Sequence, residues 1–269
     1  METPSGEYPA GLDQQHGLVR VIKEMGAELV AEEPTPCHGA SQAHRTGRSA
    51  VSHGDRFAGV DLFAEIADER RRTADVLASL TPEQMRTPSL CDAWTVRDVA
   101  AHLLMPLITP GPKFGVALIR HRLNFSRTSE ALTADVAQRS DADLVAGLRD
   151  NAASRFTPPG LGPQAPLTDV VIHGQDIRRP LGLGREFPPE RLAVVLEFLT
   201  GPDARRGFVP AARTRGLRFV ATDLDWSVGS GAEVIGPGEA VMMAVAGRAV
   251  ALDDLTGAGV ADLANRLAK

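Results

Sequence analysis

The sequence predicts a mainly α-helical protein that ends in a small unit of mixed helices and strands. Apolar residues recur at helical spacing between residues 57 and 199, with charged residues largely on the opposite sides. Near residue 201 the composition changes to a loop-like stretch that contains Gly, Pro and several arginines. Short runs of β-type residues follow that stretch. The 269 residues suffice for one large or two modest domains with a proper core.

The first part of the chain is interpreted as a tail followed by helices. Residues 1–55 are rich in Gly, Pro, Ser, Gln and His, a composition that favours a disordered tail. Thr95 is expected to cap one helix, and Asp98 gives an acidic variant of the capping box. Pro180 and Gly182 mark the end of another helix. The predicted helices are 57–80, 95–107, 113–138, 141–155, 166–179 and 188–199.

The second part of the chain has a different character. Residues 217–221, 226–228 and 232–235 are expected to form strands, and residues 238–246 and 259–268 helices. The chain is therefore expected to divide into a tail (1–55), a helical bundle (56–200) and a small α+β domain (201–269). A fragment that ends near Thr200 should then fold by itself.

Charge and composition argue against several classes of protein. The net charge of −5 and the pI near 5.8 are unlike those of a nucleic-acid-binding protein. We find no apolar run of about 18 residues and no secretory signal, so we expect a cytoplasmic protein that does not bind membranes. Cys37 and Cys91 do not suggest a disulfide framework. Cys91 is either a reactive thiol or a small packing residue, and the sequence shows no base beside it.

The helix predicted from Pro166 onward contains a candidate metal site. Asp169 and His173 are four residues apart, so both side chains share one helix face, and Asp176 lies close to that face. Apolar neighbours indicate that this face looks into the protein, where a carboxylate and an imidazole need partners. With His102 from the earlier helix, they would make a two-His, one-carboxylate site with open positions. The alternative is that each is a hydrogen-bonded core residue.

Several further residues are candidates for an outer layer of this site or for substrate contacts. Asp176 could accept the second N–H of a metal-bound imidazole. Gln175 and Arg178 follow the ligand pair closely, although Arg178 could instead form a salt bridge that closes the helix. Arg248, in a glycine-flanked turn, could bind an anion or lie at the surface.

Two motifs resemble the mycothiol-dependent maleylpyruvate isomerase family, which belongs to the DinB-like superfamily of metal-binding four-helix bundles. They are the run from Pro88 to Leu103 and the run from Asp169 to Gly182, and residues 216–257 are similar to the family's small C-terminal domain. The resemblance implies a DinB-like four-helix bundle with a small α+β C-terminal domain. It also implies a metal site at His102, Asp169 and His173, where Asp169 replaces the Glu of the family pattern.

The resemblance implies a Zn²⁺ ion (or another divalent metal) and mycothiol as thiol cosubstrate. In the family the thiolate adds to an activated double bond, the bond rotates, and elimination releases the isomer. We therefore expect a mycothiol-dependent isomerase or thiol S-transferase that acts on a small electrophilic substrate, as a monomer or weak homodimer. The alternative is a non-catalytic, metal-stabilised module that binds a ligand or a protein. Only three of the 29 basic residues are lysines, which is compatible with a GC-rich actinobacterial genome.

Overall fold

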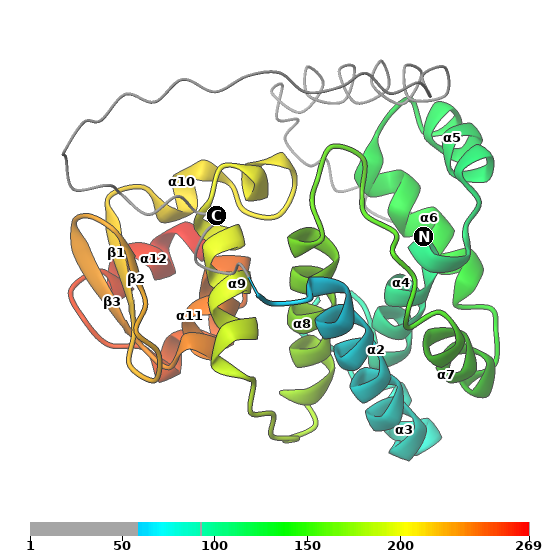
Figure 1. Ribbon diagram of the computed structural model, residues 1–269, viewed down its shortest axis with the longest axis horizontal. Coiled ribbons are helices and arrows are strands. Elements are labelled where there is room, and N and C mark those ends of the chain that lie inside the picture. Colours follow the sequence, from blue (N-terminus) through cyan, green and yellow to red (C-terminus); the bar gives the residue numbers. More distant parts are fainter. Residues whose placement is uncertain (1–58, 92, 269) are drawn as a thin grey trace, which may run out of the picture. The chain divides into compact units, whose positions relative to one another are not determined.

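The structure is a computed structural model that describes residues 59–91 and 93–268 (Figure 1). The predicted tail, residues 1–55, lies outside the described residues. Four helices form a bundle: α2 (Leu62–Ser79), α4 (Val96–Ile108), α7 (Asp141–Asp150) and α8 (Gln164–Arg178). Helices α2 and α4 each pack against both α7 and α8, so the four enclose a common core. The short helix α3 (Pro82–Met85) leads from α2 toward α4.

Polar caps explain where three of the four bundle helices begin. The Asp61 carboxylate accepts hydrogen bonds from the first backbone N–H groups of α2, and Ser140 does the same for α7. At α4, Thr95 and Asp98 form the predicted capping box, in which each side chain accepts from the backbone N–H of the other. These caps satisfy N–H groups that have no partner inside the helix.

The helix predicted over residues 113–138 is in fact two helices. Helix α5 (Gly111–Arg120) ends at His121, and α6 (Phe125–Val136) begins after a short turn. In that turn Arg122 and Leu123 both have positive φ, and the Asn124 side chain caps α6. The sequence did not indicate the break, because apolar spacing continues through it, while a capping Asn is the one local signal.

Helix α8 lies in the middle of the described structure (Figure 1). It packs against α2 and α4 on one side and against α9 (Pro189–Thr200) and α11 (Gly238–Ala246) on the other. Twelve of its fifteen residues are buried, which explains why its sequence lacks the apolar stripe of a surface helix. The side chains on the bundle face of α8 are therefore held by a rigid helix.

The C-terminal part contains a three-stranded sheet in the order β2-β1-β3. Strand β1 (Leu217–Ala221) pairs antiparallel with β2 (Ser227–Gly229) and parallel with β3 (Ala232–Gly236). Alternate residues of β1 are buried, as expected for a sheet with one covered face. Helix α11 packs against β1 and β3. Four short helices complete this part: η1 (Asp203–Arg206), α10 (Ala211–Thr214), η2 (Ala249–Asp254) and α12 (Val260–Leu267). The predicted strands are thus confirmed to within one or two residues.

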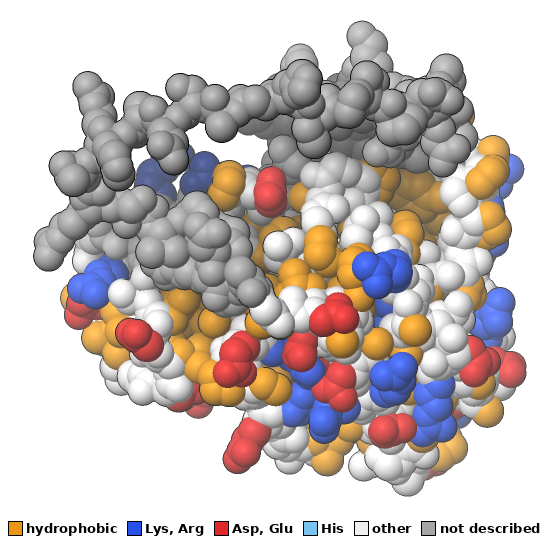
Figure 2. Space-filling model, in the orientation of Figure 1, with side chains coloured by type: hydrophobic (Ala, Val, Ile, Leu, Met, Phe, Trp, Pro, Cys, Tyr) orange, Lys and Arg blue, Asp and Glu red, His pale blue; other side chains and the backbone are white. Residues whose placement is uncertain are grey.

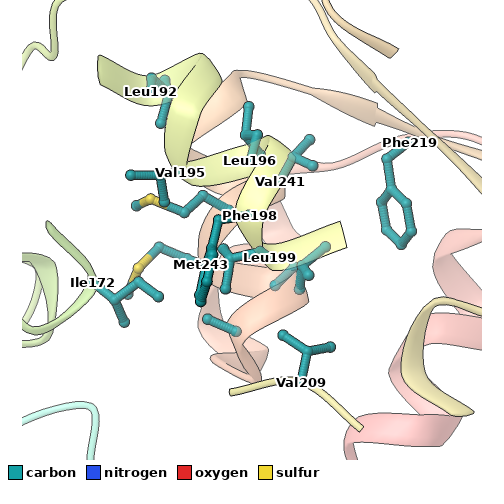
Figure 3. Close-up of a cluster of buried hydrophobic side chains, with 14 of the residues drawn as sticks. Ile172, Leu192, Val195, Leu196, Phe198, Leu199, Val209, Phe219, Val241 and Met243 are labelled. Carbon is teal, nitrogen blue, oxygen red and sulfur yellow. The ribbon is translucent and has the colours of Figure 1, made fainter. Parts of the chain in front are cut away.

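One apolar core joins the two parts of the chain (Figure 3). Ile172 of α8, Phe198 and Leu199 of α9, and Val241 and Met243 of α11 belong to the same buried cluster. The described residues, 59–91 and 93–268, accordingly fall in one compact unit. The predicted fold class is confirmed: a four-helix bundle with a small α+β part. The division near residue 201 into independently folding domains stays a prediction.

The described surface shows mixed charges. On the face seen in Figure 2, acidic and basic side chains are interspersed over the lower part of the molecule. No helix among residues 59–91 and 93–268 is long and apolar enough to cross a membrane.

Candidate metal centre

Helices α4 and α8 bring the three predicted ligands together. The Asp169 Oδ1 atom lies 3.5 Å from His173 Nε2 and 3.8 Å from His102 Nε2. His102 and His173 are also in ring contact, with centroids 4.8 Å apart. All three donor atoms lie within 4.8 Å of one another. The side chains are 15 to 30% exposed, so the cluster is partly shielded yet still open to solvent.

The charges around Asp169 favour its ionised form. Burial alone would raise the pKa of Asp169, but His102, His173 and Arg70 together hold it below its ordinary value. Arg70 is itself fixed, because its Nη1 donates to the carbonyls of Ala152 at 3.2 Å and Ser154 at 2.8 Å. A carboxylate that stays ionised over the neutral pH range is the form that binds a cation.

His173 is held by a second carboxylate on its other side. Its Nδ1 lies 2.8 Å from Asp176 Oδ2, and the Asp176 side chain is completely buried. Burial disfavours the charged imidazole, but Asp176, Cys91 and Asp169 raise the pKa of His173 to about 10 in the absence of a metal ion. An ion must therefore displace a proton, so metal binding should tighten as the pH rises.

Asp176 is the centre of a hydrogen-bond cluster that reaches the C-terminal part. Arg248 donates from Nε to Asp176 Oδ1 at 2.9 Å and from Nη2 to Asp176 Oδ2 at 2.5 Å. Burial would raise the pKa of Asp176, but Arg248 and His173 hold it far below its ordinary value. Burial would lower the pKa of the Arg248 guanidinium, but Asp176 raises it above its ordinary value, so both members of this pair stay charged.

Cys91 also belongs to this cluster, which the sequence analysis did not predict. Its Sγ donates to Asp176 Oδ2 at 2.9 Å, lies 3.5 Å from His173 Nδ1, and accepts from Arg248 Nη2 at 3.3 Å. The loop before α4 reaches α8 through a backbone hydrogen bond from Leu90 to Asp176. Cys91 and Asp176 are 85 residues apart, so no local spacing pattern could have indicated this contact.

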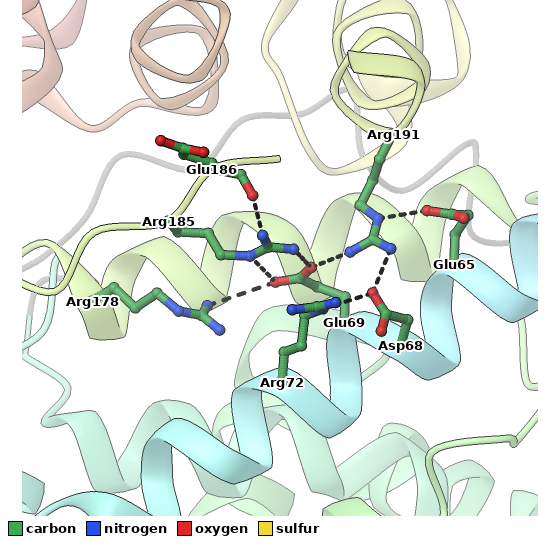
Figure 4. A network of polar contacts seen from close by, with 8 residues as sticks. All are labelled: Glu65, Asp68, Glu69, Arg72, Arg178, Arg185, Glu186 and Arg191. Carbon is green, nitrogen blue, oxygen red and sulfur yellow. Dashed lines mark hydrogen bonds and ion pairs between the residues drawn. The ribbon is translucent and has the colours of Figure 1, made fainter. Parts of the chain in front are cut away.

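Two of the predicted outer residues lie elsewhere. The Gln175 amide donates to Glu239 and does not contact the candidate ligands. Arg178 is buried in a separate charge network, where it lies 3.7 Å from Glu69 (Figure 4). Both follow His173 closely in sequence, but helical rotation turns them toward α11 and α2 instead.

The donor set and its spacing suit a divalent ion. With metal–donor distances of about 2.0–2.1 Å, tetrahedral donors lie roughly 3.3–3.4 Å apart, close to the two distances that involve Asp169. Two imidazoles and one carboxylate are typical donors for zinc. Among the described residues, no further His, Cys, Asp or Glu belongs to the group of His102, Asp169 and His173, so the site keeps at least one open position. His102 Nδ1 is buried without a hydrogen-bond partner among the described residues.

Comparison with known proteins points to one family. Two crystal structures resemble the chain, that of the mycothiol-dependent maleylpyruvate isomerase and that of a histidine-to-alanine mutant of it, with 15% and 14% identity. Each alignment covers 75% of this chain and 95% of the other, with a TM-score of 0.49. No curated protein matches the chain significantly. A family model described as "Mycothiol maleylpyruvate isomerase N-terminal domain" matches residues 66–178, from α2 to the end of α8. Residues 66–178 therefore match the family that the two sequence motifs resemble.

Proposed function

We propose that the protein is a mycothiol-dependent metalloenzyme, an isomerase or thiol S-transferase, that acts on a small electrophilic substrate. The observation that carries the proposal is the convergence of His102, Asp169 and His173 with only three protein donors. A closed structural site would use four protein ligands, whereas a catalytic site keeps a position for an exchangeable ligand. The family match supports mycothiol as the thiol.

The chain's own residues have separate roles in this proposal. His102 and His173 would each offer a neutral Nε2, and Asp169 a carboxylate oxygen that Arg70 helps to keep ionised. Asp176 accepts the Nδ1 proton of His173 and so directs the Nε2 lone pair toward the ion. Trp94 lies against His102, with ring centroids 5.0 Å apart, and limits access of water on that side. A bound divalent ion would supply the chemistry that deprotonates a coordinated thiol at neutral pH.

Metal content is the first test. Purified protein should contain close to one divalent ion per chain, and the His102→Ala and His173→Ala variants should contain almost none. His121→Ala is the matched control, because His121 ends α5 and does not belong to the donor group. Metal content by mass spectrometry that is unchanged in both ligand variants would contradict the assignment.

Thiol binding is the second test. Cobalt(II) in place of the native ion gives an intense sulfur-to-metal absorption band when a thiolate coordinates. Mycothiol should produce this band, and glutathione should act less well if the sugar portion of mycothiol is recognised. Absence of the band at saturating mycothiol, with cobalt bound, would leave water as the exchangeable ligand and favour a metal-dependent hydrolase.

A further inference from the structure

The Asp176 carboxylate accepts hydrogen bonds from three separate segments of the chain. These are His173 of α8, Cys91 of the loop before α4, and Arg248 of the C-terminal part. Oδ2 takes the Nδ1–H of His173, the S–H of Cys91 and one N–H of Arg248, while Oδ1 takes the Nε–H of Arg248. Each carboxylate oxygen has about two lone-pair sites, so the three donors at Oδ2 share that atom, while Oδ1 takes a single donor.

We propose that Cys91 is a positioning residue of the metal centre. Its thiol acts through Asp176: with Arg248 it holds the carboxylate so that Oδ2 takes the His173 Nδ1 proton and Nε2 stays free to bind the ion. This inference rests on the proposed metal site, and it assigns Cys91 neither as a ligand nor as the reacting thiol.

The position of Sγ supports this assignment. Sγ lies on the Nδ1 side of His173, at 3.5 Å from that atom, whereas Asp169 Oδ1 lies 3.5 Å from Nε2. The thiol and the Asp169 carboxylate therefore contact opposite nitrogens of the imidazole ring. Its direct contact is with the carboxylate, at 2.9 Å, and partners that orient a metal-bound imidazole are the groups on which metal affinity depends.

The loop that carries Cys91 is built to hold the thiol in place. Ser89 Oγ accepts from the Cys91 backbone N–H at 3.1 Å and donates to the Trp94 carbonyl at 2.8 Å. The Trp94 N–H in turn donates to the Cys91 carbonyl at 2.8 Å, and Leu90 bonds to the Asp176 carbonyl at 3.2 Å. These bonds hold the N–H and the carbonyl of Cys91 in place and fix the position of the loop against α8.

The test compares Cys91→Ala with Cys91→Ser in the full-length chain. Alanine removes the donor, whereas serine keeps an O–H that can reach Asp176. Zinc affinity is measured by competition with a chromophoric chelator, and thermal unfolding is recorded separately. Cys91→Ala should weaken zinc binding by roughly 10- to 100-fold, as loss of an outer partner typically does, and Cys91→Ser should restore most of it. Ser89→Ala is the matched control, since it loosens the same loop without removing the thiol.

Three outcomes would overturn the proposal. Wild-type zinc affinity in Cys91→Ala would show that the thiol only packs, even if the melting temperature falls. Equal loss in Cys91→Ala, Cys91→Ser and Ser89→Ala would assign the effect to loop geometry. A sulfur-to-cobalt band in wild-type protein without added thiol, lost in Cys91→Ala, would make Cys91 a ligand. Failure of mycothiol to bind to protein with normal metal affinity would contradict the proposed function alone.

Discussion

The length of the Asp169 side chain bears directly on the strength of the metal site. In the family pattern a glutamate is expected at this position, yet the shorter aspartate reaches both imidazoles, at 3.5 and 3.8 Å. Its ionisation is supported by Arg70, and by the imidazoles when they are protonated. We therefore expect the charge of residue 169, rather than the length of its side chain, to matter most for binding of an ion at the proposed site.

Substitution of Asp169 separates these two properties. Asp169→Asn keeps the size but removes the charge, and should weaken metal binding by at least the roughly 10- to 100-fold typical of outer partners. Asp169→Glu keeps the charge with one more methylene group and should weaken binding much less. Chelator competition at pH 7 measures both. Similar affinity in wild type and Asp169→Asn would show that the carboxylate is not a ligand.

At the scale of elements, α2 and α9 are joined by a buried charge network (Figure 4). Arg191 of α9 is almost fully buried and pairs with three carboxylates of α2, those of Glu65, Asp68 and Glu69. Glu69 is completely buried and is also paired with Arg185. This network fixes how α9 lies against α2, because moving the helices apart would leave the buried Arg191 and Glu69 charges without their partners.

Removal of Arg191 should destabilise the protein strongly. Arg191→Met removes one of the cations that pair with Glu69. Breaking a buried pair costs about 3–5 kcal/mol, and the cost here should be somewhat smaller because Arg185 still pairs with Glu69. Arg72→Met is the control: Arg72 is 54% exposed and bonds Asp68 at the surface, so its loss should cost under about 1 kcal/mol. Urea unfolding at pH 7 measures both, and equal costs would contradict a special role for the buried pair.

The same network predicts a response to acid. Burial would raise the pKa of Asp68, but Arg72 and Arg191 hold it below the ordinary value of 3.8. A lowered folded-state pKa contributes stability that is present above about pH 4 and is lost as the pH falls through the lowered value. Arg191→Met should therefore lose less stability than wild type between pH 5 and about pH 3.

Helices and strands could be predicted from the sequence more fully than the contacts between distant residues. The predicted cap at Thr95 and the apolar spacing indicated most helices, but no local pattern showed that Arg122 and Leu123 would interrupt one. Helical spacing and family resemblance brought His102, Asp169 and His173 together as candidates, and the structure places them side by side. The Cys91–Asp176 contact depends on how a loop meets a helix 85 residues later, which no local pattern encodes.

At the scale of the whole molecule, the candidate metal centre and the C-terminal part are joined by direct contacts. Arg248 follows α11 and reaches Asp176, the partner of a candidate ligand. Apolar side chains of α8, α9 and α11 meet in one cluster (Figure 3). The C-terminal part is therefore expected to stabilise the bundle and to orient His173, whether or not it can fold alone.

Truncation after Thr200 tests this dependence. The fragment loses α11 and exposes the buried face of α9, which includes Val195, Leu196 and Leu199. Each such side chain contributes roughly 1.5–3 kcal/mol when buried, against a total stability of about 5–15 kcal/mol for a typical protein. The sequence alone predicted that this fragment folds by itself, but the shared apolar core leads us to expect that it keeps helical circular dichroism, binds the dye ANS and unfolds without a cooperative transition. It should also bind zinc more weakly than Arg248→Met in the full chain, which loses the Asp176 contact but keeps the core. A fragment that unfolds cooperatively and binds zinc like wild type would instead establish residues 56–200 as an independent domain.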